Sequence, residues 1–125
     1  MILDTNVLID LEKGHPNAHA WLKTLSAPPS VCGFSAMEFK QGAHGFMGLR
    51  QAEQFLSPFE IVWATESDLD RALTEYARYP HTHGVGLLDL LIATTAVGRG
   101  EELVTFNLKH FQVIPGLVTT QPYQR

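Results

Sequence analysis

Three acidic residues stand in apolar stretches where a charged side chain is unexpected. Asp4 follows Met-Ile-Leu, Glu38 lies within Phe-Ser-Ala-Met-Glu-Phe, and Asp89 interrupts Gly-Leu-Leu-Asp-Leu-Leu-Ile. An ionised carboxylate is costly to remove from water unless it is paired, hydrogen-bonded or bound to a cation. A shared divalent-metal site would explain all three positions, since Mg²⁺ and Mn²⁺ prefer oxygen ligands such as carboxylates.

A site of this kind would suit the hydrolysis of a phosphodiester. One or two ions held by carboxylates can lower the pKa of a water molecule and neutralise charge on the leaving oxygen. The net charge of -4 argues against a broad basic surface for nucleic acid. It does not exclude a nuclease, because the metal-binding acids contribute to that charge and a bound cation reverses the local field.

Each acid also has an ordinary structural interpretation. Asp4 could be the N-cap of a following helix, and Ser35-Ala-Met-Glu38 matches a capping box in which the glutamate reaches back to the cap. Asp89 in a first helical turn would suit the helix dipole, although its leucine neighbours leave little water nearby. Asp10, later in the same segment as Asp4, is interpreted as a solvated surface residue.

Length and composition indicate one domain over residues 1–125. The chain has 125 residues, 45% of them hydrophobic, which is enough for one core. The longest apolar run, residues 85–97, contains Asp89 and is too short to span a bilayer, and no secretory signal is recognisable. We therefore expect a soluble cytoplasmic protein. The single cysteine, Cys32, is expected to pack as a small hydrophobe.

Short apolar runs alternate with segments of helical periodicity. The predicted strands are residues 1–3, 30–34, 59–63, 102–105 and 112–114. The predicted helices are residues 6–12, 16–25, a segment from 35 interrupted by the glycine-rich stretch 42–48, residues 52–56, a segment capped by Thr65 and Asp68 that runs to Tyr79, and residues 87–97. This alternation favours a parallel sheet flanked by helices, whose ligand sites lie at the carboxyl ends of the strands.

Three segments together resemble the PIN domain. They are MILDTNVLIDL, the stretch around Glu38, and LLDLLIATTAVGRGEELVTFNLKHF, and their order and spacing cover almost the whole chain. Within that family, the small size resembles the toxin component of VapBC-type bacterial toxin–antitoxin systems. The resemblance implies a three-layer α/β/α sandwich with a central, mostly parallel sheet of four to five strands. It also implies a metal-dependent endoribonuclease in which Asp4, Glu38 and Asp89 bind Mg²⁺ or Mn²⁺.

The last motif departs from the family pattern. The family often has a fourth acid there, whereas this chain has Asn107 and His110 at the candidate positions. Asn107 could supply a carbonyl oxygen, and His110 could donate to phosphate if protonated. We expect one tightly held metal, or a second ion recruited only with RNA. The expected catalytic residues are Asp4, Glu38, Asp89 and Asn107, supported by Thr5, Asn6, Thr105 and His110.

The resemblance implies an RNA substrate, a cognate antitoxin protein and a homodimer. The apolar, glycine-rich segment 42–49 would suit an antitoxin helix or a dimer face if Phe46 and Met47 are exposed. The main rival is a catalytically degenerate PIN domain that acts as a protein- or RNA-binding module, a possibility raised by the missing acid. His81 and His83 are interpreted as polar loop residues, because no third ligand lies nearby in the sequence.

Two other enzyme or ligand classes fit the sequence poorly. An aspartate-nucleophile phosphatase also begins with an aspartate after its first strand, but it needs a second one two residues later, where Asn6 stands. A nucleotide-binding module is unsupported because neither G-x-G-x-x-G nor G-x-x-x-x-G-K-[ST] occurs.

Overall fold

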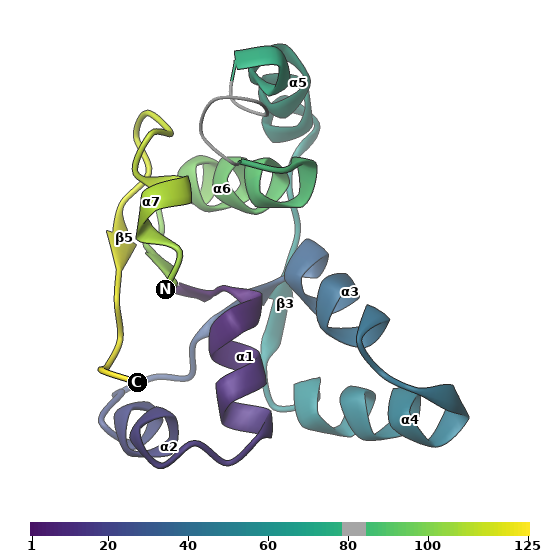
Figure 1. The fold of residues 1–125 in the computed structure, drawn as a ribbon. Coiled ribbons are helices and arrows are strands. Elements are labelled where there is room, and N and C mark those ends of the chain that lie inside the picture. The colour runs from purple at the N-terminus through teal and green to yellow at the C-terminus, as the bar shows by residue number, and fades with distance from the viewer. Residues whose placement is uncertain (79–84) are drawn as a thin grey trace.

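The computed structural model describes residues 1–78 and 85–125, with all their side chains except those of Phe46 and Ala77. Its strands form a single parallel sheet in the order β3-β2-β1-β4-β5 (Figure 1). They are β1 (Ile2–Leu3), β2 (Ser30–Cys32), β3 (Glu60–Val62), β4 (Leu103–Val104) and β5 (Thr119–Thr120). The expected parallel sheet is confirmed, with the first strand at its centre.

Helices cover both faces of this sheet, as expected for a three-layer sandwich (Figure 1). They are α1 (Thr5–Glu12), α2 (Pro16–Lys23), α3 (Gly33–Gln41), α4 (Gly45–Leu56), α5 (Glu66–Glu75), α6 (Leu87–Arg99) and α7 (Leu108–Phe111), with a 3₁₀ turn at Tyr76–Arg78. None of the helices in the described ranges is long and apolar enough to cross a membrane.

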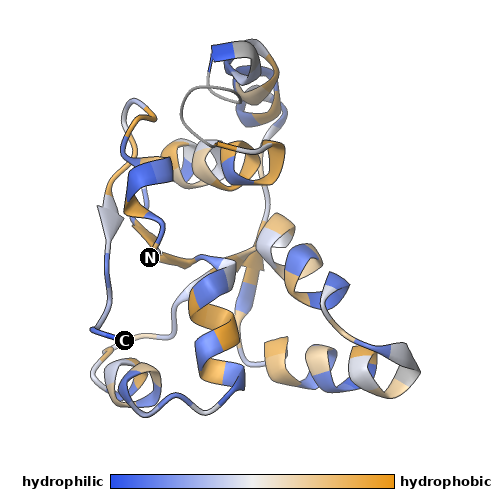
Figure 2. Ribbon diagram, viewed as in Figure 1, coloured by the Kyte–Doolittle hydropathy of each residue, from blue (hydrophilic) through white to orange (hydrophobic). Residues whose placement is uncertain are grey.

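The strands alternate between two hydrophobic cores, which is the period-two pattern of extended chain. Ile2 and Leu103 face a core shared with α5, α6 and α7, while Leu3, Val31 and Val104 face a core shared with α1 to α4. All five side chains are at most 1% exposed. The central strands β1 and β4 are apolar, whereas the edge strand β5 is Thr119–Thr120 and the helices carry polar residues along their length (Figure 2). The sheet is therefore held by burial on both sides.

The strand register brings three chain segments to one level. Ile2 pairs with both Ser30 and Leu103, so Asp4 leaves β1 beside the residues that follow β2 and β4. The backbone N–H of Asp4 donates a 2.9 Å hydrogen bond to the Val104 carbonyl. The carboxyl ends of the three central strands thus form one edge, where a ligand site is expected.

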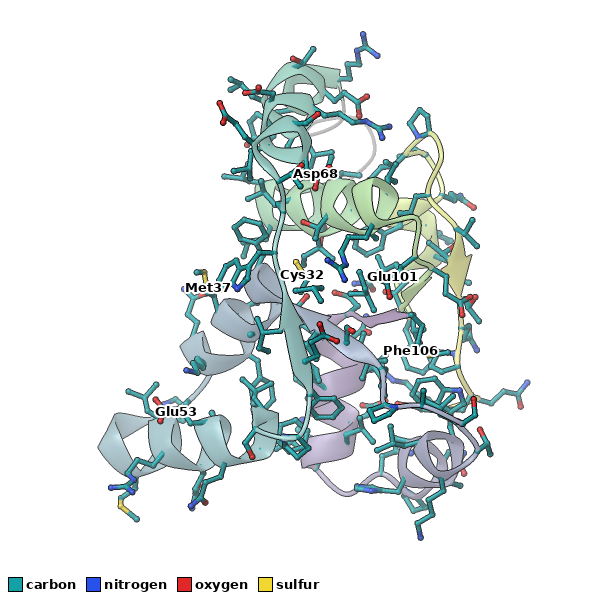
Figure 3. The ribbon with its side chains drawn as sticks, turned by 180° about the vertical axis from the view of Figure 1, so that it is seen from behind. Cys32, Met37, Glu53, Asp68, Glu101 and Phe106 are labelled. Atoms are coloured by element: carbon teal, nitrogen blue, oxygen red, sulfur yellow. The ribbon has the colours of Figure 1, made fainter. Side chains whose placement is uncertain are left out.

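The contact between α5 and α6 depends on a capped aspartate and a glycine. Thr65 and Asp68 form the predicted capping box: the Thr65 backbone N–H donates to Asp68 Oδ2 at 2.9 Å, and the Asp68 N–H donates to Thr65 Oγ1 at 3.1 Å. Asp68 lies between the two helices (Figure 3). A Cβ atom at Gly98 of α6 would overlap the Asp68 carboxylate. Glycine is therefore required for this close approach.

The structure contradicts one predicted element near the end of the chain and confirms the break predicted in the glycine-rich stretch. The final strand predicted at residues 112–114 is wrong: β5 lies later, at Thr119–Thr120, and pairs with β4. Residues 112–114 instead follow α7, and Ile114 is buried in the core beside α6. A short apolar run does not distinguish a strand from a buried turn. The predicted break in the glycine-rich stretch is confirmed, because α3 ends at Gln41 and α4 begins at Gly45.

Candidate active site

Asp4 follows β1 and is the N-cap of α1, with 4% of its surface exposed. Its Oδ1 accepts a 2.8 Å hydrogen bond from the Thr5 backbone N–H, and its Oδ2 accepts a 2.7 Å bond from Thr105 Oγ1. Burial raises the pKa of Asp4 from 3.8 to about 6, against the effect of these bonds, and the charges of Asp89 and Glu38 raise it further. The cap interpretation is correct, but one carboxylate oxygen is bound across the sheet.

Glu38 lies half-buried in the second turn of α3. The predicted capping box is wrong, because α3 begins at Gly33 with Cys32 as its N-cap, and Ser35 is already inside the helix. The buried Ser35 Oγ has no hydrogen-bond partner among the described groups. The Glu38 charge raises the pKa of both Asp4 and Asp89. Glu38 therefore does not cap α3, and it lies near both aspartates.

Asp89 occupies the first turn of α6, whose N-cap is Gly86. Its Oδ2 accepts a long hydrogen bond of 3.4 Å from the Gly86 backbone N–H and lies 3.8 Å from His110 Nδ1 on α7. Burial raises the pKa of Asp89, the Gly86 bond and His110 lower it, and Glu38 raises it again. The raised pKa of a half-buried carboxyl group is typical of a functional cluster.

The three acids thus approach the same edge of the sheet from α1, α3 and α6. The charges of Asp89 and Glu38 raise the pKa of Asp4, and the charge of Glu38 raises the pKa of Asp89, so the three acids are neighbours. Within residues 1–78 and 85–125, no three carboxylate, imidazole or thiol groups are already gathered at ligand distance around one point.

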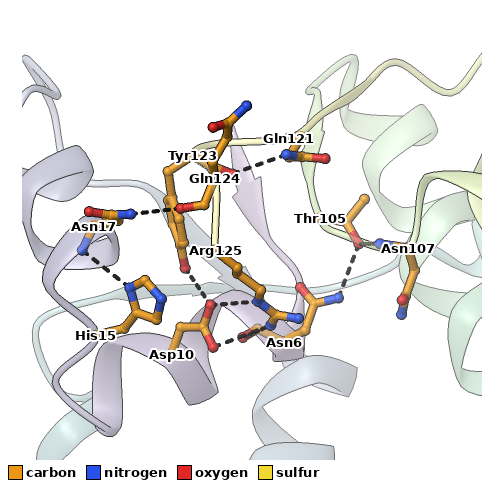
Figure 4. Close-up of polar contacts among 10 residues, drawn as sticks. All are labelled: Asn6, Asp10, His15, Asn17, Thr105, Asn107, Gln121, Tyr123, Gln124 and Arg125. Carbon is orange, nitrogen blue, oxygen red and sulfur yellow. Dashed lines mark hydrogen bonds and ion pairs between the residues drawn. The ribbon is translucent and has the colours of Figure 1, made fainter.

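Thr105 joins the start of α1 to the segment that follows β4, through hydrogen bonds with Asn6 and Asn107 (Figure 4). Its Oγ1 accepts a 3.0 Å bond from the Asn107 backbone N–H and a 3.4 Å bond from Asn6 Nδ2, while donating to Asp4. The Thr105 side chain is fully buried. Asn107 is exposed and is the N-cap of α7, although its side chain does not cap that helix.

Two buried oxygen atoms beside Asp4, Thr5 Oγ1 and Asn6 Oδ1, have no hydrogen-bond partner within the part of the chain that the structure describes. Buried polar atoms are nearly always paired, so unpaired ones call for an explanation. Together with the three carboxylates they make a set of hard oxygen donors. That set fits Mg²⁺ or Mn²⁺, which take carboxylate, amide and water oxygens.

A groove of about 650 Å³ begins at Glu38 and runs between α1, α3 and α4. Met47 lines it and is 69% exposed, which meets for this residue the condition set for segment 42–49 as a docking or dimer face. The Phe46 side chain lies outside those described, as do His81 and His83. The groove carries charges on both of its walls. Its lining includes Ile9, Glu12, Lys13, Glu38, Phe39 and Gln51.

One interpretation of the sequence is overturned beside this site. Asp10 is not solvated: its side chain is 13% exposed and pairs with Arg125 at 2.9 Å. Tyr123 also donates a 2.8 Å bond to Asp10 Oδ2. The partners lie more than a hundred positions away, so no local pattern could have revealed them.

A parallel α/β sheet with carboxylates gathered at the carboxyl ends of its central strands defines a protein with an acidic ligand site. The family model of the PIN domain matches residues 1–117. This chain belongs to the PIN domain family.

Relatives are similar over nearly their full length. A protein named Ribonuclease VapC10 from Mycobacterium tuberculosis is 33% identical, with 94% of this chain and 90% of the relative aligned. Among solved structures, a toxin–antitoxin complex from Klebsiella pneumoniae contains a chain with a TM-score of 0.78 and 28% identity, covering 99% of this chain and 98% of that one. VapBC2 from Rickettsia felis, bound to a promoter DNA fragment, has a TM-score of 0.78 and 25% identity, covering 95% and 96%.

Proposed function

We propose that this chain is a divalent-metal-dependent endoribonuclease, built as a single PIN domain and acting in the cytoplasm as the toxin of a toxin–antitoxin pair. The observation that carries the proposal is the placement of Asp4, Glu38 and Asp89 at one edge of the sheet, where burial, and then the charges of Asp89 and Glu38, raise the pKa of Asp4 to about 6. A carboxylate buried as deeply as Asp4 is costly to ionise, and a bound divalent cation would offset that cost. The relatives named ribonucleases support RNA as the substrate.

Asp4, Glu38 and Asp89 would hold Mg²⁺ or Mn²⁺. When bound, such an ion lowers the pKa of a water molecule and neutralises charge developing on a phosphodiester. Thr105 fixes the Asp4 carboxylate through its 2.7 Å bond, so that oxygen is oriented before the substrate arrives. Asn107, exposed just after β4, is free to meet the substrate or a water molecule with its amide.

The proposed site holds one ion tightly. The position that often carries a fourth acid is filled by Asn107 or His110, and His110 Nδ1 lies 3.8 Å from Asp89 Oδ2. An imidazole there adds no negative charge to the cluster. A second ion would then need oxygen ligands from the RNA phosphate itself.

The test is cleavage of a total small-RNA pool by the purified chain in Mn²⁺, Mg²⁺ or EDTA. We expect discrete fragments with either metal, none with EDTA, and none from Asp89→Asn. Asp70→Asn is the matched control, because Asp70 is an exposed aspartate on α5, away from the carboxyl edge of the sheet. It should cleave like the wild-type chain.

Absence of cleavage by folded, antitoxin-free protein would instead favour the degenerate binding module. Mn²⁺ binding, measured by calorimetry, separates the two cases further. A nuclease should lose metal binding and cleavage together in Asp89→Asn, whereas a binding module should show neither activity from the start.

An antitoxin protein and a second copy of the chain are the proposed partners. The relatives include chains from structures described as toxin–antitoxin complexes. Light scattering of the purified chain should report a dimer. Co-expression with an antitoxin should suppress RNA cleavage, and unchanged cleavage in a stable complex would contradict the toxin role.

A further inference from the structure

The residues after β5 extend to α1 and α2, where Tyr123 and Arg125 lie beside Asp10 and Gln124 lies beside Asn17 (Figure 4). Arg125 Nε and Nη2 donate to Asp10 Oδ2 and Oδ1 at 2.9 and 3.2 Å, and Tyr123 donates to the same carboxylate at 2.8 Å. The Asn17 side chain donates a 2.7 Å bond to the Gln124 carbonyl. The tail is thus bound to α1 and to α2 by several contacts.

The Arg125 guanidinium contacts both segments that flank the candidate active site. On α1 it binds Asp10 and donates a 3.4 Å bond to the backbone carbonyl of Asn6. On the other side its Cζ lies 4.2 Å from the centre of the Phe106 ring, a cation–π contact. Phe106 stands between Thr105 and Asn107, and the Tyr123 ring also packs against it edge-on at 4.9 Å.

Few other contacts join these two segments within the described part of the chain. Among the described residues, the side-chain hydrogen bonds between residues 4–12 and residues 105–107 all involve Thr105. The bond from Asn6 to Thr105 is long, at 3.4 Å. A planar guanidinium with two donors fixed on a carboxylate is a rigid spacer between a helix and an aromatic ring. Small changes in this spacing would move Asp4 and Asn107 relative to each other.

We propose that Arg125 is a positioning residue of the active site, which sets the spacing between the start of α1 and residues 105–107 through Asp10, Asn6 and Phe106. This inference rests on the metal site proposed above. It gives the Asp10 carboxylate a role in the reaction without contact with metal or substrate. Groups hydrogen-bonded directly to a metal ligand change metal affinity by roughly ten- to a hundredfold, and Arg125 acts one contact further out.

The test measures Mn²⁺ affinity of the full chain by EPR titration, with the unfolding midpoint in EDTA recorded alongside. Arg125→Gln is expected to weaken Mn²⁺ binding by up to about tenfold, the lower end of the range for direct partners of a ligand. Arg125→Lys should restore part of the affinity, because lysine keeps the charge but cannot bind both carboxylate oxygens in a fixed plane. Asp10→Asn should weaken binding as well, and it supplies a second variant if Arg125→Gln fails to fold.

Arg99→Gln is the matched control. Arg99 also binds a carboxylate through Nε, at 2.7 Å from Glu101 Oε2, but at the opposite end of the sheet. It should leave Mn²⁺ affinity unchanged.

A tail that serves only as a structural anchor would lower the unfolding midpoint in Arg125→Gln while Mn²⁺ affinity stays at the wild-type value. That result would overturn the inference and leave the proposed nuclease intact. A wild-type chain that binds no Mn²⁺ would contradict both.

Discussion

Thr105 Oγ1 donates a 2.7 Å hydrogen bond to Asp4 Oδ2 across 101 positions of sequence. The two residues follow neighbouring parallel strands, and neither is more than 4% exposed. Because the same hydroxyl accepts bonds from Asn107 and Asn6, its loss would leave three polar groups without their partner. One hydroxyl group therefore organises the carboxyl ends of β1 and β4.

Replacement of Thr105 by valine should lower the free energy of unfolding by about 1–3 kcal/mol, the cost of buried polar groups left unsatisfied. Thr105→Ser keeps the hydroxyl and should lose much less. Urea unfolding at neutral pH in EDTA measures both variants. A valine variant as stable as the serine variant would show that the hydroxyl is not needed in the metal-free protein.

Asp4→Asn should stabilise the metal-free protein above pH 6. The pKa of Asp4 is raised from 3.8 to about 6 on folding, so its favourable contribution is complete below pH 3.8 and is lost as the pH rises through 6. At pH 8 the ionised group costs up to about 3 kcal/mol. Urea unfolding from pH 4 to 8 in EDTA measures this. The free energy of unfolding of the variant should rise relative to that of the wild type as the pH increases.

The matched control for that series is Asp70→Asn, on the exposed face of α5. Its stability should follow the wild-type curve at every pH. Parallel curves for Asp4→Asn and wild type would contradict a raised Asp4 pKa.

Mn²⁺ affinity should depend on pH in the opposite sense to the stability of the metal-free protein. A carboxylate ligand must be deprotonated to bind, and Asp4 loses its proton near pH 6. We expect affinity to fall by about tenfold per pH unit well below 6 and to level off above 7. Calorimetric titration at several pH values measures this, and affinity that is constant from pH 5 to 8 would argue against Asp4 as a ligand.

Gly98→Ala and Gly48→Ala should change stability in opposite directions. Both glycines lie within helices, but a Cβ at Gly98 would overlap the Asp68 carboxylate, whereas one at Gly48 would meet Ala43 at an ordinary 3.6 Å. Gly48→Ala should stabilise by about 0.5–1 kcal/mol through helix propensity. Gly98→Ala should destabilise by about 1–3 kcal/mol through overpacking. Thermal unfolding of the two variants provides the comparison.

Local sequence patterns predicted those parts of the fold and the site whose positions depend only on where a strand or a helix begins or ends. Asp4 and Thr105 were placed at strand ends because apolar runs stop there, and the parallel register then makes them neighbours. The Thr65–Asp68 cap was predicted for the same reason, since both partners lie within one turn.

The errors arose where distant contacts decide local structure. Ser35 matched a cap pattern, yet α3 begins at Gly33, where Trp63 from the end of β3 packs so closely that a side chain would not fit. Asp10 was interpreted as solvated because its partners, Tyr123 and Arg125, lie more than a hundred residues further along the chain. Neither signal exists within a short window of sequence.

The central position of β1 sets the order in which the site can form during synthesis. β4 follows β1 by about a hundred residues, so Asp4 is enclosed only after Leu103–Val104 has been made. Pairing of such distant segments is slow, because a long loop must close first. A ribosome translating this chain therefore carries an unfinished site while the hundred residues between β1 and β4 are made, and the candidate active site is assembled only after β4 has emerged.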